Sequence, residues 1–540
     1  MNVYITIVAV VILLCIIAEK FSGRFGMPAL IFFMFLGMLF GSDGLLKIPF
    51  DDFKLAENAC SVALLFIMFY GGFNTKWKLA KTVAVKSILL STLGVIITAL
   101  VTALLCMVFL HYSPVQSFLI GAVLSSTDAA SVFSILRKKK LNLKDGTASL
   151  LEVESGSNDP ISYMLTLIAV GLINASGSSN IPMQICTQLF FGILIGTGFA
   201  LFSITVMTKT TLISEGLDTV FMIAMALACY SITNLCNGNA YLSVYLMGIL
   251  IGNSHITHKN TLIPFFDGVT GLAQILIFFL LGLLAFPHQM PQIIPDALAI
   301  TLFLTIAARP VAVFLLLMPF NLLSKYNPKI TPCSLKQMSL ISWAGLRGAS
   351  SSVFAIFAIS NCATISHDLF HIVFMVSLFS VSVQGTLLSK VATKLDMIDE
   401  NADVRKTFND YQEDSAITLM RMHIPAGHHW ENKEIKDVTM PTGSLAIMIK
   451  REDETIITKG NTKILAGDDV ILSVPAYEPA EHEKLEETVI DKSHPWCNHS
   501  IASLNLAPNE LITMIIRENE NLIPDGKTLI HENDIVVMYK

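Results

Sequence analysis

The sequence predicts an all-α polytopic membrane domain followed by a small α+β tail, and three observations carry this prediction. Hydrophobic residues make up 53% of the 540 residues and charged residues only 14%, whereas soluble proteins carry about 25% charged residues. Up to about Lys390, the chain is a series of apolar runs long enough to cross the ~30 Å hydrocarbon core of a bilayer. From about Leu395 onward these runs are absent and charge rises.

The charge balance and the cysteines argue against two further classes of protein. The net charge is −6, which lacks the basic footprint that nucleic-acid-binding proteins show. None of the nine cysteines stands in a CxxC pair. Several lie inside apolar runs, where cysteine acts as a small packing residue. We therefore expect no disulfide framework and no cysteine-based metal site.

The apolar runs predict about thirteen transmembrane helices. The expected spans are residues 3–18, 28–42, 56–73, 87–110, 115–135, 151–174, 184–207, 217–236, 239–252, 262–286, 294–318, 337–360 and 367–389. Loops on one side hold sixteen lysines and arginines, whereas the other set holds only Lys47 and Lys54. Because basic loops stay in the cytoplasm, we predict that the N-terminus lies outside. The tail, which follows an odd number of spans, is then cytoplasmic.

A few ionisable residues interrupt the runs, and such residues are expensive at membrane depth and mark functional sites by default. Asp128 lies in a Ser- and Thr-rich stretch of the fifth span, and Arg347 in a Gly- and Ser-rich stretch of the twelfth. Both stretches are poor continuous helices, because polar side chains compete for backbone hydrogen bonds. Residues 131–135 and 352–356 are also similar, 221 residues apart. The pattern predicts inverted repeats with two broken crossing helices.

The sixth span adds polar side chains at helical spacing. Ser155 and Asp159 are four residues apart and therefore share a helix face. With Asp128 and Thr127 they form an oxygen-rich set that suits a hard monovalent cation. Burial disfavours the ionised form of a carboxyl group, so Asp159 is also suited to holding a proton. We expect Asp159 to have a functional role.

A structural alternative stays open, in which Asp128 and Asp159 only neutralise Arg309 and Arg347 as buried ion pairs. The count of charges limits this alternative, because the segments hold more carboxyl groups than guanidinium groups. The carboxyl groups are those of Asp128, Glu152, Glu154 and Asp159. At least one carboxyl group is therefore left over to titrate.

The segment Glu154–Pro160, together with Ser126–Asp128 and Trp343–Gly348, resembles the sodium/proton-exchanger family of cation/proton antiporters. The resemblance covers the whole membrane domain and is, more narrowly, to bacterial and archaeal members with a cytoplasmic regulatory domain. It implies a homodimer in the cytoplasmic membrane that exchanges K+ or Na+ for H+. It implies no enzymatic activity, no resident cofactor and no metal beyond the transported monovalent cation.

The resemblance also implies roles for individual residues. Asp159 is the carboxylate that binds cation and proton in turn, and Glu154 with Arg347 is a structural ion pair that holds the broken helices together. The remaining residues of the implied cation and proton site are Asn158, Asp128, Thr127 and Ser155. An Asn-Asp pair, rather than Asp-Asp, is the family's mark of electroneutral exchange. Tyr70 stands where some relatives have an acidic residue, which puts an outer-shell carboxylate on that helix in doubt.

The tail matches itself without gaps when shifted by 66 residues. Each copy is predicted to hold a short helix, a strand (445–450 or 511–516), a turn and a last strand (470–474 or 535–539). The pattern resembles the TrkA-C subdomain of potassium-conductance regulators, without their nucleotide-binding half. The expected domains are a transmembrane domain at 1–392, a linker at 393–414 and TrkA-C-like copies at 415–476 and 482–540.

The resemblance of the tail has consequences for regulation and for the cation. In related modules the cleft between two copies holds a small ligand, in some cases a cyclic dinucleotide. Arg451 and Arg517 end equivalent strands and can approach phosphate-like anions, so we expect them to contact a regulatory nucleotide. A tail that serves only as a dimerisation clamp stays open as an alternative. The link to potassium favours K+ over Na+.

Two other functions compete with cation/proton antiport. A cation channel gated by the tail needs a selectivity filter, and no TVGYG-type sequence is present. A membrane enzyme is expected to carry a motif such as HExxH or GxSxG, and neither occurs. The sequence therefore favours a secondary active transporter over a channel, and a channel over an enzyme.

Overall fold

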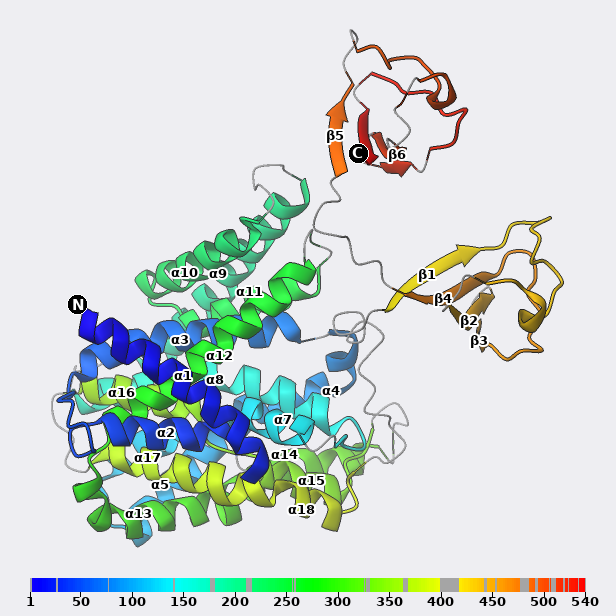
Figure 1. The fold of residues 1–540 in the computed structure, drawn as a ribbon. Coiled ribbons are helices and arrows are strands. Elements are labelled where there is room, and N and C mark those ends of the chain that lie inside the picture. The colour runs from blue at the N-terminus through cyan, green and yellow to red at the C-terminus, as the bar shows by residue number, and fades with distance from the viewer. Residues whose placement is uncertain are drawn as a thin grey trace. The chain divides into compact units, whose positions relative to one another are not determined.

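The computed structural model of the chain divides into two compact units, residues 1–404 and 405–540, and each is described by itself (Figure 1). The structure describes residues 2–25, 28–75, 77–138, 141–174, 180–209, 216–254, 256, 259–324, 326, 331–362, 368–398, 417–440, 444–451, 454–475, 485–490, 494–504, 506, 511–517, 520–522, 524–532 and 534–539.

The described part of the first unit is built from helices. They are α1 (Asn2–Phe25), α2 (Ala29–Phe40), α3 (Phe53–Asn74), α4 (Trp77–Leu89), α5 (Val95–Phe109), α6 (Pro114–Val123), α7 (Ala129–Lys138), α8 (Thr147–Ile173), α9 (Ile181–Lys209), α10 (Asp218–Leu235), α11 (Ala240–Gly252), α12 (Lys259–Leu283), α13 (Met290–Leu302), α14 (Arg309–Leu323), α15 (Leu335–Trp343), α16 (Ala349–Asn361), α17 (Leu369–Phe379) and α18 (Thr386–Lys394). The π-helical turns η1 (Leu90–Gly94), η3 (Phe303–Ala308) and η4 (Ser380–Gly385) join α4 to α5, α13 to α14 and α17 to α18.

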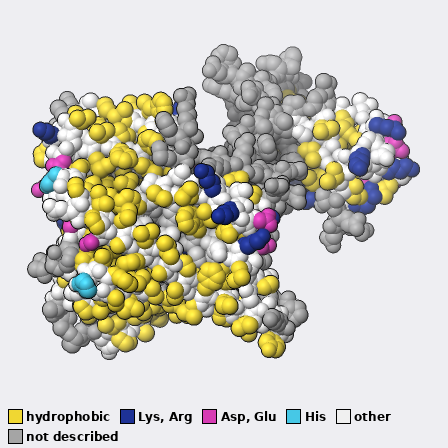
Figure 2. Space-filling model, turned by 90° about the horizontal axis from the view of Figure 1, so that it is seen from below, with side chains coloured by type: hydrophobic (Ala, Val, Ile, Leu, Met, Phe, Trp, Pro, Cys, Tyr) yellow, Lys and Arg dark blue, Asp and Glu magenta, His cyan; other side chains and the backbone are white. Residues whose placement is uncertain are grey.

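This unit is a helical membrane domain. Within the described residues, 8 helical stretches are long and apolar enough to cross a membrane, and α2, α6, α11 and α16 are shorter apolar helices. Figure 2 shows hydrophobic side chains over most of the visible face of this unit. Such side chains are stable against lipid tails, which are as apolar as leucine. The exact number of crossings and the inverted repeat stay predictions.

The two polar segments that the sequence singles out both interrupt helices. α6 ends at Val123 and α7 begins at Ala129, while α15 ends at Trp343 and α16 begins at Ala349. The two breaks contact each other, because the backbone N–H of Asp128 donates to the carbonyl oxygen of Leu346 at 2.8 Å. Broken helices are tolerated at membrane depth where protein buries them, so this contact defines the inside of the domain.

The chain that follows α18 is held against the loop between α7 and α8. Leu143 and Ile398 form an isolated antiparallel β-bridge. The ammonium group of Lys144 lies 2.9 Å from Oδ1 of Asp396. We call residues 396–398 the strap. It fastens the end of the membrane unit to the loop that leads into α8.

The strap changes the predicted start of the linker. Residues 393 and 394 belong to α18, and the strap is bound to the membrane unit, so the predicted linker at 393–414 begins too early. Its remaining residues, 399–414, lie outside the described part of the chain. The other predicted domain boundaries stay predictions.

The tail holds two four-stranded antiparallel sheets. In the first, β1 (Ile417–His423), β2 (Leu445–Arg451), β3 (Glu454–Ile457) and β4 (Asp469–Pro475) lie in the order β1-β4-β2-β3. In the second, β5 (Leu485–Val489), β6 (Leu511–Arg517), β7 (Glu520–Leu522) and β8 (Ile535–Tyr539) lie in the order β5-β8-β6-β7. The predicted strands coincide with β2, β4, β6 and β8. The predicted short helices are single 3-10 turns at Ile435–Asp437 and Ile501–Ser503.

Candidate functional site

Asp159 lies in the middle of α8, with 3% of its surface exposed. The hydroxyl group of Ser126, from the first helix break, donates to its Oδ1 atom. The hydroxyl group of Ser350, in the first turn of α16, donates to its Oδ2 atom at 2.7 Å. Within the described part of the chain, these partners of the carboxylate are neutral. Asp159 is therefore a buried carboxylate that both broken helices contact and no arginine neutralises.

A second group of polar contacts lies one turn earlier on α8. The hydroxyl group of Ser155 donates to the carbonyl oxygen of Thr127 at 2.7 Å, and Nδ2 of Asn158 donates to Oγ1 of Thr127 at 2.5 Å. Oδ1 of Asn158 is buried without a hydrogen-bond partner among the described residues. These contacts join α8 to the first helix break. They bring together three of the predicted site residues.

Asp128 is positioned at the start of two helices. Its carboxylate accepts hydrogen bonds from the backbone N–H of Ser131 at 3.2 Å and from the Ser131 hydroxyl at 2.5 Å, and so caps α7. A Cβ atom added to Gly348, the residue before α16, would lie 2.0 Å from Oδ2 of Asp128. Only glycine fits there. The carboxylate thus faces the positive ends of two helix dipoles, which stabilise an anion.

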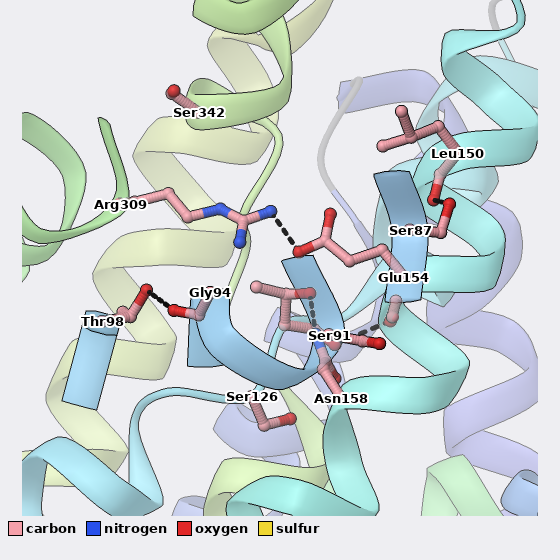
Figure 3. A network of polar contacts seen from close by, with 12 residues as sticks. Ser87, Ser91, Gly94, Thr98, Ser126, Leu150, Glu154, Asn158, Arg309 and Ser342 are labelled. Atoms are coloured by element: carbon pink, nitrogen blue, oxygen red, sulfur yellow. Dashed lines mark hydrogen bonds and ion pairs between the residues drawn. The ribbon is translucent and has the colours of Figure 1, made fainter. Parts of the chain in front are cut away.

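The prediction that Glu154 pairs with Arg347 is wrong, because the structure gives Glu154 a different arginine. Glu154 pairs with Arg309, whose Nη2 atom lies 2.6 Å from Oε1 of Glu154, and both side chains are buried (Figure 3). Figure 3 shows Arg309 reaching across to Glu154, with Asn158 and Ser126 beyond this pair. The pair joins α14 to α8. It neutralises one carboxylate near the site.

Arg347 has a different role, which explains the error. Its Nη1 atom donates to the carbonyl oxygens of Ser125 at 2.9 Å and Ser126 at 2.5 Å. These carbonyl groups follow α6, where a helix end leaves acceptors without intrahelical partners. A guanidinium group also suits the negative end of a helix dipole. Arg347 therefore holds the broken helices together through backbone carbonyl groups, and not through a carboxylate.

Sequence reasoning missed the roles of Ser126 and Ser350 as hydrogen-bond donors to Asp159. Both stood in the polar segments that predicted the helix breaks. Several hydroxyl groups are adjacent there, and only the path of the broken backbone decides which one points to the carboxylate. The signal that could have found them is the serine-rich start of α16, at residues 350–352, facing the Asp-bearing break.

Tyr70 bears on the question of an outer-shell carboxylate. Its hydroxyl group donates to Oδ1 of Asp267, from α12, at 3.2 Å. An acidic side chain is therefore present beside this position, but it belongs to another helix and is a partner of the tyrosine. Its participation in the cation site stays untested.

The two arginines of the tail are bound by aspartates of their own copies. Arg451 donates from Nε and Nη2 to the two carboxylate oxygens of Asp468, both at 2.8 Å. Arg517 donates in the same way to Asp534 at 2.8 and 2.7 Å. Asp468 and Asp534 are fully buried. Each guanidinium group therefore already holds a bidentate carboxylate, and the contact of these arginines with a regulatory ligand stays a prediction.

Comparisons with known proteins agree with this organisation. Residues 9–394 match the family described as sodium/hydrogen exchanger, transmembrane, and residues 419–476 and 485–539 match the TrkA-C domain. The chain is 32% identical over 476 residues to the K(+)/H(+) antiporter NhaP of Alkalimonas amylolytica, covering 87% of this chain and 81% of that protein. It is 30% identical over 475 residues to the K(+)/H(+) antiporter NhaP2 of Shewanella sp. (strain MR-4), covering 86% and 80%.

The solved structures include a similar fold. The sodium proton antiporter MjNhaP1 from Methanocaldococcus jannaschii, at pH 8, superposes with a TM-score of 0.63. The match covers 73% of this chain and 99% of that chain, at 22% sequence identity. At this identity the match establishes the shared fold of the membrane unit and nothing further.

Proposed function

The chain belongs to the sodium/hydrogen exchanger family, and from this premise we propose that it exchanges a monovalent cation for H+ across the cytoplasmic membrane. It is a secondary active transporter and a multi-pass membrane protein. One observation carries the proposal. Asp159 is buried, is contacted by both broken helices and has only hydroxyl donors among the described residues.

A single carboxylate couples the two substrates because it cannot hold both at once. When a proton occupies Asp159, the neutral carboxyl group has little attraction for a cation. When the proton leaves, the carboxylate attracts a cation, and serine hydroxyl groups can turn their oxygen lone pairs toward it. Asn158 stays uncharged in both states. The site therefore carries the same net charge with either substrate, and exchange is electroneutral.

The residues around Asp159 supply the oxygen atoms that hard cations prefer. Ser126 and Ser350 contact the carboxylate directly, and Thr127, Ser155 and Asp128 lie at the adjoining helix break. K+ is the favoured cation in this proposal. Its support is the TrkA-C match of the tail and the similarity to proteins named K(+)/H(+) antiporters.

The proposal extends to topology and assembly. The membrane unit crosses the bilayer about thirteen times as inverted repeats, with the N-terminus outside and the tail in the cytoplasm, where the basic loops place it. The protein works as a homodimer in which the ion-site helices move against the rest. A channel gated by the tail is the weaker alternative, because a buried carboxylate that alternates between substrates explains the site without a continuous pore.

The tail is proposed to regulate exchange, with a nucleotide such as a cyclic dinucleotide as its ligand. Arg451 and Arg517 are not assigned to that ligand, because aspartates of the tail bind them. The strap supports a regulatory role, since it connects the end of α18 to the loop before α8. A tail that serves only as a clamp would leave exchange unchanged when residues after 404 are removed.

Flux through proteoliposomes tests the proposal. Purified protein is reconstituted with a pH-sensitive dye inside, and K+ or Na+ is added outside in matched vesicles. An antiporter alkalinises the lumen because the added cation enters in exchange for internal H+, with no dependence on membrane potential, and K+ gives the larger signal. Uncoupled current without proton movement would refute antiport. A larger Na+ signal would refute only the preference for K+ and would leave the proposed antiport intact.

A further inference from the structure

Two tyrosines of α11 lie one helical turn apart and face α8 on either side of Asp159. Tyr241 and Tyr245 are both buried. Residues four apart lie on the same helix face, and the two helices run antiparallel here. Tyr241 meets Tyr163, four residues after Asp159, and Tyr245 meets Gly156, three residues before it. α11 therefore brackets the carboxylate with two aromatic rings.

The layer at Tyr241 is thick. Its ring packs edge-on against Tyr163, with centroids 4.8 Å apart, and against Tyr230 at 5.4 Å. Tyr163 also lies 5.6 Å from Phe354 and 5.5 Å from Phe357, both on α16. Aromatic pairs at such distances stabilise beyond their buried area. Five rings therefore close this side of Asp159.

The layer at Tyr245 is thin. A Cβ atom added to Gly156 would lie 2.7 Å from Cε2 and from the hydroxyl oxygen of Tyr245, so the ring rests directly on the bare backbone of α8. The hydroxyl group of Ser157 donates to the hydroxyl oxygen of Tyr245 at 3.3 Å, which is longer than the usual O–H···O distance. One ring closes this side, held by hydrogen bonds to Ser157 and to Thr75 at the end of α3.

The thin layer separates a buried carboxylate from an exposed one. Glu152, Gly156 and Asp159 are spaced four and three residues apart and share a face of α8. Glu152 is exposed, whereas Asp159 is buried. Tyr245 covers Gly156, between the two. Glu152 is also nearer to the basic loop before α8, which marks the cytoplasmic side.

The contacts of α11 show how the thin layer can open. Gly248 and Gly252 of α11 approach the backbone of α3, where an added Cβ would lie 2.3 Å from Phe69 O and 2.0 Å from Phe73 O. α11 is thus packed closely on α3, while α8 is fastened to the broken helices. On the Tyr241 side, Nδ2 of Asn239 donates to the carbonyl oxygen of Pro160 at 2.7 Å. This bond ties α11 to α8 on the Tyr241 side, away from the contact of Tyr245 with Gly156.

We propose that Tyr245 is the cytoplasmic gate of the ion site, a single ring that slides off Gly156 to admit cation or proton to Asp159. The aromatic cluster at Tyr241 closes the opposite side. This inference rests on the proposed function and adds the residue that controls access. It predicts that removing the Tyr245 ring exposes Asp159 to one side of the membrane only.

Carboxyl labelling from each side tests the gate without relying on transport. Inside-out and right-side-out vesicles are treated with a water-soluble carbodiimide and an amine, and modification of Asp159 is measured by mass spectrometry of the purified full-length protein. Tyr245→Ala is expected to raise labelling several-fold in inside-out vesicles and to leave it unchanged in right-side-out vesicles. Tyr245→Phe keeps the ring and is expected to label like the parent protein.

Gly156→Ala is the second variant, because its methyl group displaces the ring without deleting it. It is expected to raise labelling from the same side even if Tyr245→Ala fails to fold. Unchanged labelling in both variants, an equal rise from both sides or a rise only in right-side-out vesicles overturns the proposal. If labelling responds as expected but the protein does not exchange protons for cation, the gate is supported and the proposed antiport is refuted.

Discussion

The membrane unit and the tail both bury aspartates, and they satisfy them in opposite ways. In the tail, Asp468 binds both nitrogens of an arginine fork and also accepts the backbone N–H of Leu465 at 2.8 Å. In the membrane unit, Asp159 has two serine hydroxyl groups. A fully paired carboxylate is fixed in one charge state. A carboxylate held by hydroxyl groups can exchange its charge for a proton, and the proposed function depends on that difference.

Glu154 sharpens the comparison, because it lies five residues before Asp159 on the same helix. Its partner is a buried arginine at 2.6 Å, as in the tail. Depth in the membrane is therefore not what makes a carboxylate functional. The absence of a permanent counter-charge distinguishes Asp159 from its neighbour within the described part of the chain.

The largest effect is expected from the same substitution in the two units. Asp159→Asn removes the carboxylate that we propose alternates between proton and cation, so exchange is expected to fall to background. Asp468→Asn changes a carboxylate of equal chemistry in the tail and leaves basal exchange measurable. Cation-driven proton flux in proteoliposomes measures both. Exchange at a normal rate in Asp159→Asn would remove Asp159 from the site.

The second effect concerns the paired carboxylate of the membrane unit. Glu154→Gln leaves Arg309 buried without a counter-charge, and breaking such a pair costs about 3–5 kcal/mol. The double variant with Arg309→Gln is expected to lose less than the two single variants together. Thermal unfolding in detergent measures each variant. Arg347→Gln is the matched control, because Arg347 binds carbonyl groups, and its combination with Glu154→Gln is expected to be closer to additive than the combination with Arg309→Gln.

The third effect tests whether the arginine–aspartate pair in each copy of the tail stabilises only its own sheet. Arg451→Lys and Arg517→Lys keep the charge but lose the fork that binds both carboxylate oxygens. A hydrogen bond to a charged group contributes about 1.5–3 kcal/mol, so each variant is expected to destabilise its own sheet by that amount. Amide hydrogen exchange of the full-length protein reports β2 and β6 separately. Equal loss of protection in both sheets for one variant would contradict independent pairs.

The smallest effect is a dependence of the tail on acid. Burial alone raises the pKa of Asp468, but the hydrogen bonds from Arg451 and Leu465 outweigh it, and the pKa lies below its ordinary value. The pair therefore contributes its full stability above the unfolded pKa of about 3.9 and loses it as the pH falls through the lower folded pKa.

Fluorescence of Trp430, which is buried in the hydrophobic core beside the first sheet, can follow this loss. The full-length protein is used with its other three tryptophans replaced by phenylalanine. The signal is expected to hold at neutral pH and to change only in strong acid, and Asp468→Asn is expected to weaken the dependence. A transition near neutral pH that survives this substitution would assign the acid response to other groups.

Much of the membrane site could be read from the sequence, because the rules that break helices are local. Polar residues around Asp128 and glycines around Arg347 predict the two interruptions wherever the chain runs. The choice between Arg309 and Arg347 as the partner of Glu154 could not be predicted from the sequence. Both are buried arginines of equal charge, and the choice depends on how α14 and the second break pack against α8.

The tail shows the same limit at smaller scale. β2 and β4 contain short apolar runs that the sequence reveals, whereas β3 has only four residues, too few to show a pattern. Arg451 ends β2 where a regulatory ligand could meet it, and the sequence also holds its actual partner, Asp468. Only the antiparallel pairing of β2 with β4 brings these two side chains together.

The strap determines where the chain can be truncated without damaging the membrane unit. Hydrophobicity ends near Lys390, yet residues 396–398, the last that the structure describes before β1, pair with the loop before α8. A chain stopped at Lys394 would lose the partner of Leu143 together with the tail. Altered exchange in such a protein would report damage to the membrane unit. A stop after residue 404 keeps the strap and isolates the contribution of the tail.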